Sequence, residues 1–249
     1  MNHTLQKILF SALLIGSGSC MAATDLRTVV DASVEPLMQQ QGIPGLSVAV
    51  VNQGKVQYFN YGVASRETKQ AVNQDTLFEI GSISKTFTAT LGGYAQATGK
   101  LDLSDTASQH LPALAGGVFD HISLLQLATY TPGGLPLQFP DAADNAGAML
   151  GYFQHWKPAY APGEQRLYSN PSIGLFGYLA AQSLGQPFNV AMEKTLLPKL
   201  GLTNTHVSVP ASKTAQYAQG YDKNLKPIRV SPGALDSDCL LYTSPSPRD

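Results

Sequence analysis

The stretch Phe78–Phe87, FEIGSISKTF, carries a serine and a lysine three residues apart, directly after a glycine. The apolar spacing that follows continues to Ala97 and predicts a helix over Ser82–Ala97. Residues three apart on a helix share one face, with their Cβ atoms about 5–6 Å apart. The spacing therefore predicts that Ser82 and Lys85 lie side by side at the start of a helix.

This pair has the chemistry of an activated nucleophile. A serine hydroxyl attacks poorly unless a neighbour takes its proton, and a lysine amine can do so. Free N–H groups in the first helical turn, together with the helix dipole, can also hold an oxyanion. By themselves the two residues leave a plainer interpretation open, in which Ser82 caps the helix and Lys85 is solvated.

A second candidate segment is Arg166–Phe176, RLYSNPSIGLF, a loop that runs into a helix predicted over Pro171–Leu184. A phenol at Tyr168 could relay a proton to or from Ser82. An amide at Asn170 could bind a substrate amide or fix Lys85. The alternative is a packing role for the tyrosine and an N-cap role for the asparagine ahead of a proline at the first helical position. Both interpretations can hold together.

The rest of the pattern indicates an α+β chain. A helix is predicted over Asp25–Gln41, and a β-hairpin over Leu46–Val51 and Lys55–Ser65. Further helices are predicted over Leu103–His110, Ser123–Thr129, Asn145–His155 and Pro187–Leu197. Two strands alone make a poor sheet, yet no further strand is evident before the chain ends.

The net charge and the spacing of possible metal ligands indicate which partners and cofactors are not expected. The 249 residues carry a net charge of −1, which gives no reason to expect a nucleic acid or an anionic membrane as partner. No group of histidine, cysteine and carboxylate residues has the spacing of metal ligands, so no metal and no cofactor is expected.

Residues 1–22 are predicted to be a signal peptide. Lys7 provides the positive charge, Ile8–Gly16 the short apolar core, and Ala22 the last residue before cleavage. A lipoprotein signal at Cys20 is a weaker alternative. The expected location is the periplasm, with no membrane attachment after cleavage.

Four segments in combination resemble the class C (AmpC-type) serine β-lactamases: GSISKTF, LLQLATYTPGGLPLQFPD, YSNPSIGLFGYLAA and VSPGALD. The resemblance extends over Asp25–Asp236. It implies a serine β-lactamase/penicillin-binding-protein-like fold, in which an antiparallel sheet packs with a helical region. It further implies a monomer that acts on a small-molecule β-lactam.

The resemblance also implies roles for individual residues. Ser82 would be acylated, and Lys85 and Tyr168 would share the base and acid work, with the initial base left undecided between them. Gln138 and Asn170 would contact the amide side chain of the substrate. The backbone N–H of Ser82 would form half of the oxyanion hole.

Three more residues lie near these motifs. By the same resemblance, Tyr130 and Arg166 form a supporting shell around the site. Glu164 precedes Tyr168 in a way that does not match a deacylating base, so it is interpreted as a loop carboxylate.

One element of the related pattern is missing. Penicillin-recognising enzymes carry Ser-x-x-Lys, then Ser-Asp-Asn, then Lys-Thr-Gly. Here Tyr-Ser-Asn stands at the second element, and Lys-Thr-Gly occurs nowhere in the chain. In the family that third element lines the site from a sheet strand and supplies the second oxyanion N–H and a cation for the substrate carboxylate. The C-terminal sheet strands and terminal helix that go with it are expected to be missing too.

The predicted organisation is therefore a partial β-lactamase domain over residues 23–238. It comprises a helix and hairpin (23–66) and a helical region with the active-site motifs (67–238). Residues 239–249 resemble nothing in the family and are interpreted as an artefactual tail, with a natural short variant as the alternative. The parent protein is expected to hydrolyse cephalosporins and penicillins, and this chain to be inactive. The rival functions are a DD-peptidase or esterase of the same fold, and a non-catalytic penicillin-binding sensor.

Overall fold

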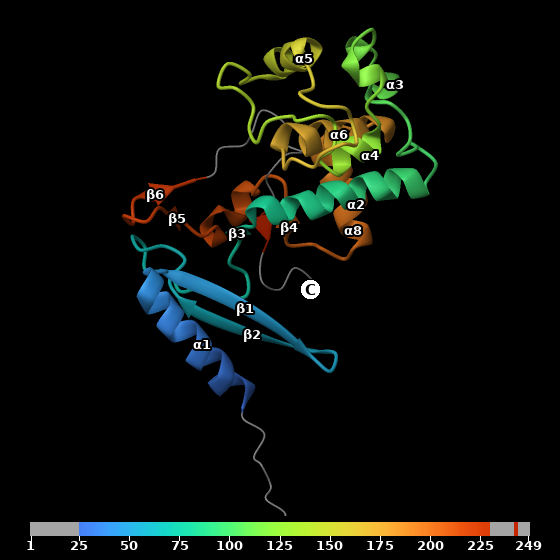
Figure 1. The fold of residues 1–249 in the computed structure, drawn as a ribbon. Helices are drawn as coiled ribbons and strands as arrows, with labels where there is room; N and C mark the ends of the chain where they lie inside the picture. Colours follow the sequence, from blue (N-terminus) through green and yellow to red (C-terminus); the bar gives the residue numbers. More distant parts are fainter. Residues whose placement is uncertain (1–24, 230–241, 244–249) are drawn as a thin grey trace, which may run out of the picture.

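The computed structural model describes residues 25–229 and 242–243. Figure 1 shows two parts, a β-hairpin covered by the first helix and a larger helical part in which α2 runs through the middle. The predicted signal peptide lies outside the described residues, as does the predicted tail apart from Tyr242 and Thr243.

The first part confirms the predicted helix and hairpin. Helix α1 spans Leu26–Gln41, and strands β1 (Gly45–Asn52) and β2 (Lys55–Gly62) pair antiparallel, with Val48 opposite Phe59. The apolar face of α1 packs on one face of this hairpin through Val30 and Val34, which lie in one buried cluster with Phe59. Burying apolar surface from both elements is what holds them together.

Helices α2 (Ser84–Ala97) and α6 (Asn170–Ser183) form the centre of the second part. Their contact is close because Gly92 of α2 has no side chain: a Cβ there would lie 2.1 Å from Cζ of Phe176. Helix α6 is buried on nearly every side, as expected for a helix that is apolar all round. The packing of these two helices therefore fixes the position of the start of α2 relative to the start of α6.

The remaining helices lie near the predicted places; the three before α6 are shorter than predicted, whereas the last helical segment runs two residues past its predicted end. They are α3 (Ala107–His110), α4 (Leu124–Ala128), α5 (Ala146–His155), α7 (Phe188–Val190) and α8 (Leu197–Lys199), with a π-helical turn over Ala191–Leu196 joining the last two. Short 3₁₀ turns cover Pro112–Leu114, Val118–Asp120 and Ala211–Gln216.

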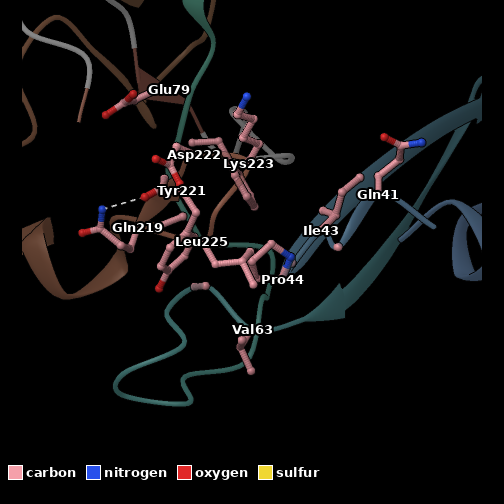
Figure 2. A pocket seen from close by; sticks show the side chains of 16 residues that line it. Gln41, Ile43, Pro44, Val63, Glu79, Gln219, Tyr221, Asp222, Lys223 and Leu225 are labelled. Atoms are coloured by element: carbon pink, nitrogen blue, oxygen red, sulfur yellow. Dashed lines mark hydrogen bonds between the residues drawn. The ribbon is translucent and has the colours of Figure 1, made fainter. Parts of the chain in front are cut away.

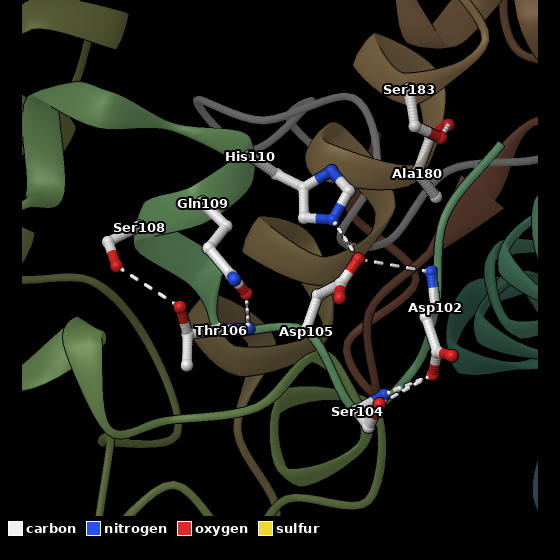
Figure 3. A network of polar contacts seen from close by, with 9 residues as sticks. All are labelled: Asp102, Ser104, Asp105, Thr106, Ser108, Gln109, His110, Ala180 and Ser183. Atoms are coloured by element: carbon white, nitrogen blue, oxygen red, sulfur yellow. Dashed lines mark hydrogen bonds and ion pairs between the residues drawn. The ribbon is translucent and has the colours of Figure 1, made fainter.

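The helix predicted from Leu103 begins only at Ala107, because polar side chains there bind the backbone instead. Asp102 accepts hydrogen bonds from the backbone N–H and hydroxyl of Ser104, which makes a turn (Figure 3). Thr106 and Gln109 then form a capping box that starts α3. At the last residue of α3, Nε2 of His110 lies 2.8 Å from Oδ2 of Asp105.

The expectation of no further strand is wrong. Two-residue strands occur at Phe78–Glu79 (β3), Thr205–His206 (β4), Gly220–Tyr221 (β5), Pro227–Ile228 (β6) and Tyr242–Thr243 (β7). They form two small sheets of order β3-β7-β4 and β5-β6. Strands this short show no alternating pattern in sequence, and β3 pairs with a segment far along the chain, so no local signal predicts them.

Candidate active site

The predicted nucleophile lies where the chain turns from β3 into α2. Gly81 has a φ of +52°, a left-handed conformation that glycine adopts without steric cost. The sequence pattern predicts that Ser82 lies in the first turn of the helix. Instead, Gly81–Ile83 form a 3₁₀ turn, and Ser82 therefore precedes the α-helix, which begins at Ser84. Its side chain is exposed and can be reached by a small molecule.

Lys85 lies one turn further along and points back to the serine. Its Nζ is 3.3 Å from Oγ of Ser82 and donates a hydrogen bond to the hydroxyl. The residue is only 5% exposed. A solvated lysine on an open helix face is therefore excluded, and the interpretation as a plain surface pair fails.

Tyr168 approaches the same oxygen from the loop before α6. Its Oη donates a 2.8 Å hydrogen bond to Oγ of Ser82, and Nζ of Lys85 lies 5.3 Å from the centre of its ring. The close packing of α2 on α6 brings these residues together, although 86 positions separate the tyrosine from the serine. The three residues predicted to be catalytic thus form one contact group.

Two further predicted residues contact this group. The rings of Tyr130 and Tyr168 have centroids 5.0 Å apart, and Cζ of Arg166 lies 4.9 Å from the centre of the Tyr130 ring. Burial raises the pKa of Tyr130 above its ordinary value, and so does the nearby Tyr168 phenol, while Lys85 and Arg166 act in the opposite direction. Tyr130 and Arg166 therefore lie beside the three predicted catalytic residues, and their supporting role stays a prediction.

The two predicted amide residues contact each other. Nδ2 of Asn170 donates a 2.9 Å hydrogen bond to Oε1 of Gln138. Oδ1 of Asn170 is buried and has no hydrogen-bond partner among the described residues, whereas Gln138 is exposed. The pair therefore leaves both a buried acceptor and an exposed amide beside the site.

The N-cap of α6 is Ser169, not Asn170. Its side chain accepts a 3.1 Å hydrogen bond from the backbone N–H of Ser172, while Asn170 is already helical. The hydroxyl of Ser172 in turn donates 2.7 Å to the carbonyl of Leu127 at the end of α4. Sequence reasoning missed both serines, because the second bond joins positions far apart in the chain.

Backbone bonds join the two loops that carry these side chains. The N–H of Leu167 donates to the carbonyl of Tyr130 at 2.9 Å, and the N–H of Asn170 donates to the carbonyl of Leu137 at 3.0 Å. Glu164 is exposed and accepts a 3.2 Å hydrogen bond from the backbone of Ala161, as a loop carboxylate would.

The matching family model is named Beta-lactamase, and it covers residues 30–244 of this chain. The chain belongs to the β-lactamase family. Its match runs six residues past Asp238, while the origin of residues 239–249 stays a prediction.

Curated β-lactamases are similar over most of the chain. A β-lactamase of Pseudomonas fluorescens is 71% identical over 90% of this chain and 63% of its own length. A β-lactamase of Escherichia coli (strain K12) is 47% identical over 93% of this chain and 62% of its own length. The chain thus spans about three fifths of the length of these curated relatives.

Solved structures agree with the predicted fold class. A crystal structure of a class C β-lactamase aligns with a TM-score of 0.85 at 44% identity, covering 88% of this chain and 61% of that one. A β-lactamase/D-alanine carboxypeptidase from Pseudomonas syringae aligns with a TM-score of 0.87 at 45% identity, covering 89% of this chain and 62% of that one. The α+β serine β-lactamase fold and the resemblance to class C are confirmed.

A separate cavity of about 500 Å³ lies elsewhere in this β-lactamase fold. Its wall consists of the base of the hairpin, around Pro44 and Val63, and of the segment Ala218–Leu225 (Figure 2). None of the predicted site residues lines it.

The described residues contain no cluster of three or more histidine, cysteine or carboxylate side chains that could hold a metal ion. None of the helices among residues 25–229 is both long and apolar enough to cross a membrane.

Proposed function

We propose that the whole protein hydrolyses the β-lactam ring of penicillins and cephalosporins through an acyl-enzyme on Ser82. The observation that carries this proposal is the convergence of Nζ of Lys85 and Oη of Tyr168 on Oγ of Ser82, at 3.3 and 2.8 Å. Both distances allow direct proton transfer to or from the nucleophile. Membership of the β-lactamase family supports the same reaction.

In the acylation step, Oγ of Ser82 attacks the lactam carbonyl carbon and loses its proton to whichever of the two neighbours acts in its unprotonated form, Lys85 as a neutral amine or Tyr168 as a phenolate. The carbonyl oxygen becomes an oxyanion, for which the backbone N–H of Ser82 is the proposed donor. The C–N bond of the ring then breaks, and Tyr168 returns a proton to the departing nitrogen. The phenol suits this transfer because it already donates a hydrogen bond to the serine oxygen.

In the deacylation step, water attacks the ester carbonyl and gives its proton to Tyr168. Oγ of Ser82 leaves and takes a proton from Lys85 or Tyr168, whichever served as the base in acylation, which restores the resting site. In the resting site, Lys85 contacts both the serine oxygen and the tyrosine ring.

Asn170 and Gln138 are proposed to bind the amide side chain of the substrate. An amide offers both donors and an acceptor, so it can pair with another amide. The exposed side chain of Gln138 offers such groups, and Asn170, whose Oδ1 is buried, contacts it through the 2.9 Å hydrogen bond from Nδ2.

A second candidate activity is removal of a terminal D-alanine from a peptide. It is favoured by the name of one structural neighbour, the β-lactamase/D-alanine carboxypeptidase from Pseudomonas syringae. The same serine, lysine and tyrosine chemistry would serve both reactions, because each passes through a serine ester. Turnover of a cephalosporin and of a D-alanyl-D-alanine peptide distinguishes the two.

The setting of the proposed enzyme follows from the sequence. We expect export to the periplasm after removal of residues 1–22, a monomer without membrane attachment, and no cofactor.

The chain as printed lacks Lys-Thr-Gly. It therefore also lacks half of the proposed oxyanion hole and the cation for the substrate carboxylate. Loss of one oxyanion donor typically costs about 10²–10³ in rate, so we expect this chain to be inactive by itself.

The experiment uses an extended chain, in which residues 23–238 are followed by the corresponding C-terminal segment of the Pseudomonas fluorescens relative. Incubation with a slowly hydrolysed β-lactam should add the mass of the intact β-lactam to the peptide that contains Ser82, and Ser82→Ala should abolish both the adduct and cephalosporin hydrolysis. An adduct on another serine would overturn the assignment.

A further inference from the structure

Tyr130 occupies a backbone position that normally selects glycine. It follows α4, and its φ is +63°. The N–H of Tyr130 bonds to the carbonyl of Leu127 and that of Thr131 to the carbonyl of Gln126, at 3.3 and 2.8 Å. These two bonds form the Schellman arrangement that ends many helices, in which the left-handed residue is usually glycine. A bulky aromatic residue there is conformationally strained.

Such strain persists only where the surroundings hold it in place. Here the carbonyl of Tyr130 accepts the hydrogen bond from Leu167, directly before Tyr168. Its ring packs against the main apolar core and also contacts the ring of Tyr168. The ring is therefore the feature of Tyr130 that glycine could not replace.

Each ring of this pair also lies close to a basic side chain. The guanidinium of Arg166 lies 4.9 Å from the centre of the Tyr130 ring, and the ammonium of Lys85 lies 5.3 Å from the centre of the Tyr168 ring. The negative faces of aromatic rings attract cations, and tilted rings at 5.0 Å are in favourable contact. We call these four side chains the aromatic stack.

We propose that Tyr130 and Arg166 are positioning residues, which hold the Tyr168 ring through the aromatic stack so that its hydroxyl stays on Oγ of Ser82. Tyr168 belongs to a loop, and a loop side chain that moves protons needs a rigid neighbour. Tyr130 provides one because it contacts the core. Arg166 lies against the ring of Tyr130 and is itself exposed. The kinetic part of this inference rests on the proposed function.

The groups of the stack also influence one another electrostatically. Tyr168 contributes to the raised pKa of Tyr130, whereas Lys85 and Arg166 lower that pKa, with burial as the largest cause of the shift. Removing the Arg166 charge should therefore raise the pKa of Tyr130 further. Replacing Tyr168 by phenylalanine should lower it.

The kinetic test compares Tyr130→Gly with Tyr130→Phe in the extended chain. Glycine suits the left-handed backbone but removes the ring, and phenylalanine keeps the ring and removes the hydroxyl. We expect Tyr130→Gly to lower kcat by about tenfold to a hundredfold, the usual cost of misplacing a reacting group, with KM little changed. Tyr130→Phe should restore kcat, and Arg166→Gln should lower it by a smaller factor.

Arg27→Gln is the matched control. Cζ of Arg27 lies 4.5 Å from the centre of the Phe59 ring, in the same kind of contact, but between α1 and the hairpin. This variant should leave kcat unchanged. Equal activity of Tyr130→Gly and the wild type, or failure of Tyr130→Phe to restore kcat, would overturn the proposal.

A second measurement needs no turnover. With ¹³C-labelled tyrosine, NMR titration of Tyr130 in Arg166→Gln and in Tyr168→Phe should show the opposite shifts given above. The ring of Tyr168 should flip faster in Tyr130→Gly and return to the wild-type rate in Tyr130→Phe. Unchanged titration and unchanged flipping would reject the stack even in an active enzyme. Absence of hydrolysis by the wild type would reject only the proposed function.

Discussion

The hydroxyl of Tyr168 donates a 2.8 Å hydrogen bond to Oγ of Ser82 across 86 positions of chain. Lys85 donates to the same oxygen from one helical turn away, at 3.3 Å. Three ionisable or nucleophilic groups thus share one small volume, and the removal of any one changes the surroundings of the other two.

We therefore expect Lys85 and Tyr168 to act as a unit with Ser82. In the extended chain, Lys85→Ala and Tyr168→Phe should each lower cephalosporin turnover by at least about hundredfold, the usual scale for losing a positioned acid or base. The double variant should be little worse than either single one, because residues that act together are not additive. Lys100→Ala removes an exposed charge just beyond α2 and serves as control. Near-normal turnover in either single variant would reject its assigned role.

Asn170→Ala and Gln138→Ala should change the preference among β-lactams more than the rate of ring opening. Their side chains share a 2.9 Å hydrogen bond, so the two substitutions should also be coupled in a double-mutant cycle. The measurement is kcat/KM for cephalosporins with different amide side chains. Gln57→Ala, an exposed amide on β2, is the control. A uniform loss over all substrates would indicate a structural role instead.

Gly92→Ala should destabilise the fold, whereas Gly93→Ala should stabilise it. A Cβ at Gly92 would lie 2.1 Å from the ring of the fully buried Phe176, and overpacking of this kind typically costs about 1–3 kcal/mol. A Cβ at Gly93 meets nothing within 4 Å, so alanine there should add about 0.5–1 kcal/mol through helix propensity. Urea unfolding of the extended chain measures both changes. Equal effects at the two positions would show that the α2–α6 contact is looser than described.

His206 should make the fold less stable in mild acid. Burial lowers the pKa of this histidine, and nearby Lys213 lowers it further, against an opposing effect of Glu193. The folded state therefore binds the proton less readily than the unfolded state. The stability is complete above the unfolded pKa of about 6.5 and declines as the pH falls below it.

The check is thermal unfolding of the extended chain at several values between pH 8 and 5, with His206→Gln as the comparison. The wild type should lose more stability than the variant as the pH falls. The exposed His121 provides a control, because His121→Gln should not change the slope. Parallel slopes for the wild type and His206→Gln would contradict the prediction.

The sequence by itself determined much of the local structure and indicated which residues form the candidate site. Apolar periodicity predicted α1, the hairpin and the long helices α2 and α6, because each has a repeat long enough to recognise. The spacing of Ser82 and Lys85 predicted their contact, because a helix fixes which residues share a face. Resemblance of the motifs to the class C β-lactamases indicated Tyr168, Asn170 and their neighbours.

Only the tertiary structure decided the remaining features. The contact between Tyr168 and Ser82 depends on how closely α2 and α6 pack, and Gly92 permits that approach by lacking a side chain. The two-residue strands are too short to leave a pattern, and β3 exists only because a distant segment pairs with it. The strained position of Tyr130 likewise arises where the end of α4 meets the loop before α6. Such features come from contacts between distant segments, which no local pattern records.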